Sequence, residues 1–144
     1  MIRFISITAF RVALDALLKI KRNVYAGVTM EICKAFQNLN IDQIRSNRDM
    51  ILMDNDSIVI KLRLPDKKQR LSKADGYRLI YMVMKTYPIV VLLHIYPKRG
   101  PMQKIDLEEN ELKELLKAFT AEMKSGEVVL HDINNNLETI VETV

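Results

Sequence analysis

The sequence predicts an α+β fold with helices packed on one face of an antiparallel sheet. Before residue 40 and again after residue 106, apolar side chains recur every three to four positions, which is the period of a helix. Between residues 57 and 97 the period changes to two, or to short continuous apolar runs, both typical of strands. Helices followed by contiguous strands are typical of α+β proteins.

The length and composition predict one cytoplasmic domain with no membrane partner. A chain of 144 residues, 49% of them hydrophobic, can bury one core. No apolar run reaches the roughly 20 residues that a membrane-spanning helix needs. The start, "MIRFISITAF", lacks the long apolar stretch and cleavage site of a signal peptide. The single cysteine, Cys33, lies on the apolar side of a predicted helix, so we expect a buried, inert thiol.

The first forty residues predict one strand and a helical hairpin. Residues 2–8 alternate loosely as a short strand does, and Thr8 can cap the helix that follows. A turn at residues 23–27 separates two helices, which we expect to pack together over the sheet. Their apolar stripes are Phe10, Leu14, Leu17 and Leu18 in the first helix, and Val28, Ile32, Ala35, Phe36 and Leu39 in the second.

The middle of the chain predicts three strands joined as a meander. In residues 57–64, Ile58, Ile60 and Leu62 point to one face, whereas Lys61 and Arg63 point to the other. A loop over residues 65–75 separates this strand from the next, over 76–84. The third strand, over 88–97, is a continuous apolar run, typical of a central strand covered on both faces.

The clearest helix of the sequence lies near its end. Residues 106–126 carry Asp106 and Glu109 as an N-terminal cap pattern, Gly126 as a stop, and an apolar stripe of Leu112, Leu115, Leu116, Phe119 and Met123. Residues 127–144 carry no strong signal and could form a strand and a short helix or a partly ordered tail. We therefore divide the chain into a domain over 1–126 and an extension over 127–144.

Charge is distributed unevenly. Residues 1–104 hold 19 Lys and Arg against 8 Asp and Glu, a net charge of +11, whereas residues 105–144 hold 3 against 10, a net charge of −7. This division indicates a basic surface for a polyanion and an acidic segment that could cover it, although charges scattered over a solvated surface would give the same totals.

Three strings in the strand region, "IVIKLRL", "GYRLIYMV" and "IVVLLHIYPKR", together with "ENELKELLKAF" after them, resemble the RelE/ParE superfamily of bacterial toxins. Their order and spacing resemble the RelE and HigB-like branch most, over about residues 3 to 118. The resemblance implies a RelE-like fold, with an N-terminal strand and two-helix hairpin on an antiparallel sheet and a C-terminal helix. It implies the toxin of a type II toxin–antitoxin system, an endoribonuclease that cleaves mRNA, often on the ribosome, and is neutralised by an antitoxin protein.

The family's basic site residues correspond here to Lys61, Arg78 and Arg99, with Arg63 and Lys98 as neighbours. Where many relatives carry a catalytic tyrosine, this sequence has Ile105, and Tyr96 or Tyr77 could take its place. The departure favours the alternative of a non-catalytic binding protein on the same scaffold, such as a gyrase-inhibiting toxin.

RNA cleavage of this kind needs cations beside the phosphate and a base for the 2′-hydroxyl group. We expect Arg78 and Arg99 to hold the phosphate; alternatively, Arg78 pairs with Asp75 or with an acid of the C-terminal segment. His94 has an ordinary pKa suited to a base, although a lone histidine on a central strand is often a packed core residue. Lys61 could act instead, since neighbouring arginines favour its neutral form.

Further residues are expected to bind the RNA strand outside the reacting phosphate. The loop contributes Lys67, Lys68 and Lys73, while Tyr96 could stack on a base. Alternation places Tyr77 and Tyr81 on the other face, in the core. No spacing of metal ligands and no glycine-rich phosphate loop occurs, so we expect neither metal nor cofactor.

Overall fold

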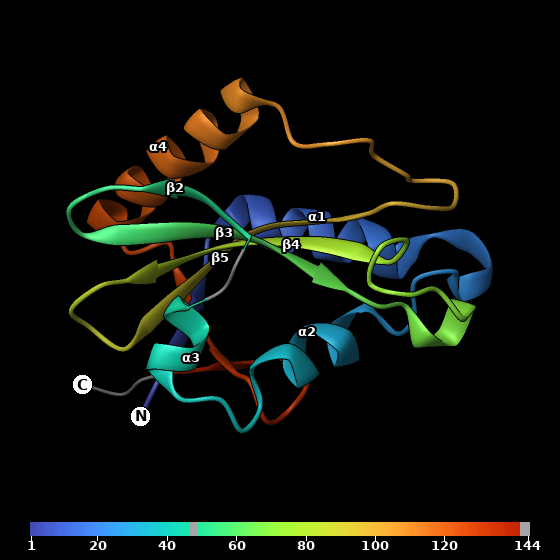
Figure 1. Ribbon diagram of the computed structural model, residues 1–144, viewed down its shortest axis with the longest axis horizontal. Helices are drawn as coiled ribbons and strands as arrows, with labels where there is room; N and C mark the ends of the chain where they lie inside the picture. Colours follow the sequence, from blue (N-terminus) through green and yellow to red (C-terminus); the bar gives the residue numbers. More distant parts are fainter. Residues whose placement is uncertain (47–48, 142–144) are drawn as a thin grey trace.

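The chain forms a mixed sheet with helices on both sides in the computed structural model, which describes residues 1–46 and 49–141 (Figure 1). The elements follow in the order β1 (Arg3–Ser6), α1 (Thr8–Lys19), α2 (Val28–Phe36), α3 (Ile41–Arg45), β2 (Met50–Met53), β3 (Ser57–Leu64), β4 (Tyr77–Met84), β5 (Ile89–Pro97), α4 (Glu109–Ser125), β6 (Val129–Asp132) and β7 (Glu138–Ile140). This arrangement confirms the α+β class. None of the helices in the described ranges is long and apolar enough to cross a membrane.

The sheet contains the predicted meander but is not purely antiparallel. The seven described strands lie in the order β2-β3-β4-β5-β1-β6-β7, and β3, β4 and β5 pair antiparallel as expected. The expectation of an antiparallel sheet is wrong at β1, which lies parallel to β5 with Phe4 opposite Val90. The long connection between these two strands allows parallel pairing, whereas short hairpin turns allow only antiparallel pairing.

Helices cover both faces of the sheet, so the expectation of helices on one face is also wrong. The ring of Phe36 in α2 packs against Tyr81 of β4. The Tyr81 hydroxyl donates a hydrogen bond to the Ile44 carbonyl of α3. Ile80 precedes Tyr81 in β4, so its side chain points to the other face of the sheet. On that face it is paired across the strands with His94 of β5, which lines the groove between α1 and α4. Figure 1 shows α4 along one side of the strands, and α2 and α3 along the other. The continuous apolar run of β5 needs this double cover because both of its faces are apolar.

The core confirms several assignments of individual residues. Tyr77 and Tyr81 are buried, as alternation predicts. Cys33 is a buried free thiol, and burial raises its pKa. Leu18 and Met123 are exposed although the helical stripes include them, because the helices turn those positions away from the sheet. Leu39 is also exposed, and it lies beyond the end of α2 at Phe36.

The helix caps differ from the predicted ones. Thr8 is the first residue of α1 rather than its cap, and both its backbone N–H and its hydroxyl donate to the Glu122 carboxylate of α4 at 2.8 Å. At the start of α4, the backbone N–H of Glu108 donates to Glu111, so the cap lies two residues after the predicted Asp106. Gly126 ends α4 with a φ of 77°, as predicted for this glycine.

Part of the segment after residue 126 belongs to the sheet. Strand β6 pairs with β1, placing His131 opposite Phe4, and β7 pairs with β6. The Nε2 atom of His131 lies 2.6 Å from the Ser6 hydroxyl oxygen, and Nδ1 lies 2.8 Å from the Leu137 carbonyl oxygen. Because a carbonyl only accepts, Nδ1 carries the proton and Nε2 accepts from Ser6. Residues 127–141 are therefore joined to β1, whereas residues 142–144 lie outside the described part of the chain.

This contact predicts a pH dependence of stability. Burial, and then the charge of Arg11, lower the pKa of His131 from its ordinary value, while its backbone hydrogen bond opposes them. A lowered pKa in the folded state means that unfolding takes up a proton, so the contribution of His131 is complete above the unfolded pKa of about 6.5 and declines as the pH falls through the folded value. We expect the melting temperature of the wild type to exceed that of His131→Gln by less at pH 5 than at pH 7.5. His94 and the carboxylates titrate in both proteins, and an unchanged difference would contradict this assignment.

Candidate functional site

Most of the predicted site residues on the strands point to the same face of the sheet. Arg63, Arg78 and Tyr96 lie directly opposite one another on β3, β4 and β5. The next row on that face contains Lys61, Ile80 and His94. Lys61 and Arg78 thus share a face, as the proposed site requires, while His94 lies two strand spacings from Lys61, roughly 10 Å away.

Arg78 is held by the protein backbone. Its side chain is largely buried, with 8% of the residue exposed. One guanidinium nitrogen donates to the Lys73 and Tyr77 carbonyls at 2.9 and 3.1 Å, and the other donates to the Ala74 carbonyl at 2.9 Å. Burial, and then the charge of Arg63, lower the pKa of Arg78. Arg78 therefore ties the end of the loop over residues 65–75 to β4. It neither projects freely toward a phosphate, as expected, nor forms the alternative pair with Asp75.

The segment between β5 and α4 covers part of the face. Figure 1 shows it running back along the side of the sheet that carries α4. Asp106 in this segment accepts from Lys61 at 3.0 Å and from the Tyr96 hydroxyl at 3.4 Å. The hydrogen bond from Lys61 is the main reason that the pKa of Asp106 is lowered. Acidic cover of the basic face, expected from charge alone, is thus supplied by Asp106 and not by the described part of the C-terminal extension.

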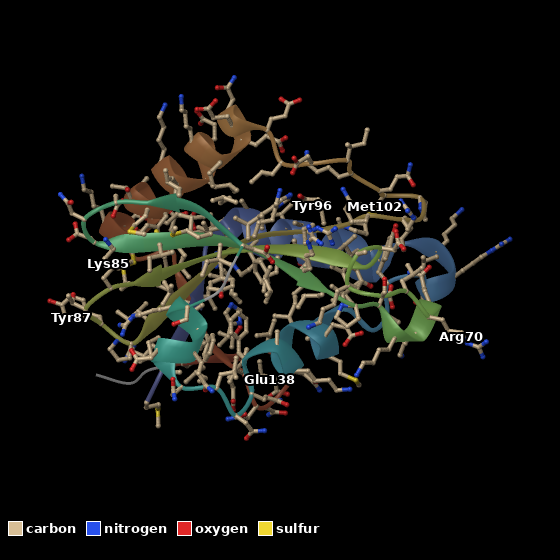
Figure 2. All side chains as sticks on the ribbon, in the orientation of Figure 1. Arg70, Lys85, Tyr87, Tyr96, Met102 and Glu138 are labelled. Carbon is tan, nitrogen blue, oxygen red and sulfur yellow. The ribbon has the colours of Figure 1, made fainter. Side chains whose placement is uncertain are left out.

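Tyr96 lies beneath this cover and is not available for stacking in this conformation. Only 3% of the residue is exposed, and Figure 2 shows it within the body of the molecule. Burial is the main reason that its pKa rises to about 12. The burial of Tyr96 does not support the expected stacking on a base. Alternation gives the face of a residue but not what covers that face.

The cations after β5 are engaged within the chain. Arg99 pairs with Asp75 at 2.6 Å, so it takes the partner that was considered for Arg78. Lys98 donates to the Ile105 carbonyl, and Lys104 pairs with Glu111 at 2.7 Å. Arg99 follows the end of β5 and is exposed, so its side chain does not join the row of Arg63, Arg78 and Tyr96.

His94 faces an apolar groove of about 590 Å³ between α1 and α4. Alanines of α1 line one wall, at Ala9, Ala13 and Ala16. Burial, and then the charge of Lys104, lower the pKa of His94. The neutral form of His94 is thereby favoured, which suits a proton acceptor. None of the loop cations Lys67, Lys68 and Lys73 lines this groove.

The remaining predicted cations cluster at a second place, which we call the basic hollow. It has a volume of about 280 Å³ and lies at the β3 edge, lined by Glu31, Lys34, Ala35, Leu62, Arg63, Leu64, Pro65, Lys67 and Lys73. Within the described ranges, the side chains of Lys34, Arg63, Lys67 and Lys73 have no hydrogen bond or ion pair. The stem of Lys68 lies instead beside Gly27, and Figure 2 shows Arg70 pointing away at the loop tip.

Two residues of these sites escaped prediction from the sequence. Lys34 was not singled out, and Asp106 was singled out only as a cap and as part of the acidic segment over residues 105–144, without Lys61 as its partner. Nothing in the local pattern marks either one, since each meets its partners through the tertiary fold. Among the described side chains, no three His, Cys, Asp or Glu residues gather as a metal site would require.

Comparisons with protein-family models, with curated proteins and with solved structures found no match.

Proposed function

We propose that this chain is the toxin of a type II toxin–antitoxin system, an endoribonuclease that binds and cleaves mRNA without a metal ion. The observation that carries the proposal is the cross-strand pair of Arg63 and Arg78, with Lys61 on the same face. Like charges directly opposite each other on neighbouring strands are destabilising. A sheet that keeps such a pair, next to a third cation, is suited to a polyanionic ligand.

In the proposed reaction a 2′-hydroxyl group loses its proton and attacks the adjacent phosphorus, which places additional negative charge on the phosphate. The bond from phosphorus to the 5′-oxygen then breaks, leaving a 2′,3′-cyclic phosphate and a 5′-hydroxyl group that takes up a proton. Lys61 is the cation best placed to stabilise that charge, since it lies on the shared face and its present partner is an exposed carboxylate. His94, favoured in its neutral form, is the candidate proton acceptor. Arg78 would act through the loop that it holds.

Asp106 stands where a substrate phosphate would meet Lys61, so RNA has to displace this carboxylate. An antitoxin would suppress the activity by presenting further carboxylates to the same face, or a helix beside it. The ribosome would be a second partner if cleavage occurs during translation.

A second candidate function is a non-catalytic toxin on the same scaffold, such as one that inhibits gyrase. The burial of Arg78 and Tyr96 favours it, because both side chains are bonded within the chain and neither faces an open reaction site.

The test maps mRNA 5′ ends by primer extension after induced expression, with substitutions that should act in opposite directions. Lys61→Ala should lower cleavage by roughly 10²–10³-fold, the usual effect of losing one donor to the transition state. Asp106→Asn should raise it by about twofold to fivefold, because an exposed ion pair contributes about 0.2–1 kcal/mol. Growth inhibition by a folded wild-type protein without new 5′ ends would reject cleavage in favour of the non-catalytic function.

A further inference from the structure

The basic hollow forms at the end of β3, beyond its pairing with β2. Strand β2 pairs with β3 at residues 58–60, so among the described strands residues 62–64 pair only with β4. Helix α2 forms one wall there and the loop after β3 forms the other. Lys34 comes from the helix, Arg63 from the strand, and Lys67 and Lys73 from the loop that follows the strand. Tertiary packing therefore brings Lys34 beside three cations from a later stretch of the chain.

Buried polar contacts fix the walls of the hollow. Glu31, with 5% of the residue exposed, accepts the backbone N–H of Lys67 at 2.8 Å. Asp66, also buried, accepts from the Tyr77 hydroxyl at 2.8 Å and from Gln69. At the other end of the loop, Arg78 donates to the carbonyl of Lys73. Three buried charged groups therefore hold the backbone that presents Lys67 and Lys73.

The hollow carries an excess of positive charge. Among the described residues that line it are four cations and one carboxylate, Glu31. In contrast, Lys61, Arg99 and Lys104 each pair with a carboxylate of this chain. Buried groups position the loop, while the ammonium groups have no partner in the part of the chain that the structure describes. The arrangement is therefore organised in advance for an anionic ligand.

We propose that the basic hollow binds backbone phosphates of single-stranded RNA next to the reacting phosphate. This inference rests on the proposed function for the identity of the ligand. Cations from three separate elements suit several phosphates of one strand better than a single small anion. The apolar floor of Ala35, Leu62 and Leu64 offers a surface for a ribose or a base. Arg63 belongs both to the hollow and to the row with Arg78, so one strand can pass from the sheet face into the hollow.

The test measures binding of a 2′-O-methyl RNA oligonucleotide, which cannot be cleaved through its 2′ position, by fluorescence anisotropy at several salt concentrations. The variant combines Lys34→Ala, Lys67→Ala and Lys73→Ala. Its matched control combines Lys19→Ala, Lys85→Ala and Lys124→Ala, which removes the same charge elsewhere; Figure 2 shows Lys85 at the end of the sheet opposite the loop. Thermal melts of both variants establish that they fold.

We expect the hollow variant to lose roughly 30-fold to 100-fold in affinity at low salt, and the control to lose less than about threefold. The slope of log K against log salt should become shallower by about 2, because each lost phosphate contact removes about 0.7 from it for a single strand. Equal losses in the two variants, no loss in either, or no RNA binding by the wild type would overturn the proposal. Polyglutamate serves as a second probe that imitates an acidic protein. If the hollow variant loses binding to polyglutamate but keeps its RNA affinity, the proposal is overturned in favour of an acidic protein as the ligand.

This outcome is separable from that of the cleavage experiment. A wild type that binds the oligonucleotide through the hollow but produces no new 5′ ends leaves the hollow in place and rejects the ribonuclease. Cleavage with unchanged binding in the hollow variant rejects the hollow alone.

Discussion

Arg78→Ala should lower the free energy of unfolding by about 2–4 kcal/mol, because it leaves three backbone carbonyls without the donor that now satisfies them. For a domain of this size, that loss corresponds to a melting temperature lower by roughly 10 °C. The measurement is thermal unfolding followed by circular dichroism. If Arg78 were a water-facing cation on a strand, its replacement by alanine would change the free energy of unfolding little. The predicted loss therefore follows from its hydrogen bonds to the backbone.

Two further variants make the Arg78 prediction specific. Arg63→Ala removes the cation directly opposite, which is exposed, and should change stability by no more than about 0.5 kcal/mol. Arg78→Lys keeps the charge but cannot reproduce the fork of two nitrogens, so its melting temperature should lie between those of the wild type and Arg78→Ala. Melting of Arg78→Ala within about 2 °C of the wild type would contradict the role in holding the loop.

Gly76→Ala should be the most destabilising single substitution that we predict. A Cβ atom at this position would lie 2.0 Å from the Leu64 carbonyl oxygen, 2.8 Å from the Pro65 carbonyl carbon and 2.9 Å from the Asp66 nitrogen. All three atoms belong to the backbone, so no side chain can swing away to make room. We expect a loss of about 4 kcal/mol or more, seen as a much lower melting temperature or as failure to accumulate folded protein.

Gly126→Ala is the matched control for Gly76→Ala. Gly126 has a φ of 77°, which costs an alanine about 1–2 kcal/mol, but no atom lies within 4 Å of the added Cβ. The same chemical change therefore meets only backbone strain at residue 126 and a steric clash at residue 76. If the melting temperature of Gly76→Ala is as high as that of Gly126→Ala, the backbone of residues 64–66 does not approach Gly76 as closely as described.

The elements that depend on neighbouring residues were predictable from the sequence. The stripes of α1, α2 and α4 and the alternation of β3 are periodic within single segments, so each could be recognised without its partners. The stop at Gly126 is equally local. Alternation also placed Lys61 and Arg63 on one face, and Tyr77 and Tyr81 in the core, since a strand fixes the direction of each side chain by its position.

Contacts between distant segments decided the rest. The parallel pairing of β1 with β5, the split of α1 and α2 between two faces, and the addition of β6 to β1 depend on which surfaces bury one another. The short strand β2 and helix α3 were missed for a different reason, because runs of four or five residues carry too little periodicity.

The candidate sites show the same division at the level of single charges. Local pattern identified the cations of β3, β4 and the loop, but it could not tell a free cation from an engaged one. Asp106 reaches Lys61 across 45 positions of sequence, whereas Lys34 meets the loop cations because α2 packs beside the end of β3. Periodicity is a property of one element, while the environment of a charge depends on elements that only the folded chain brings together; for this reason the direction of these side chains was predictable and their partners were not.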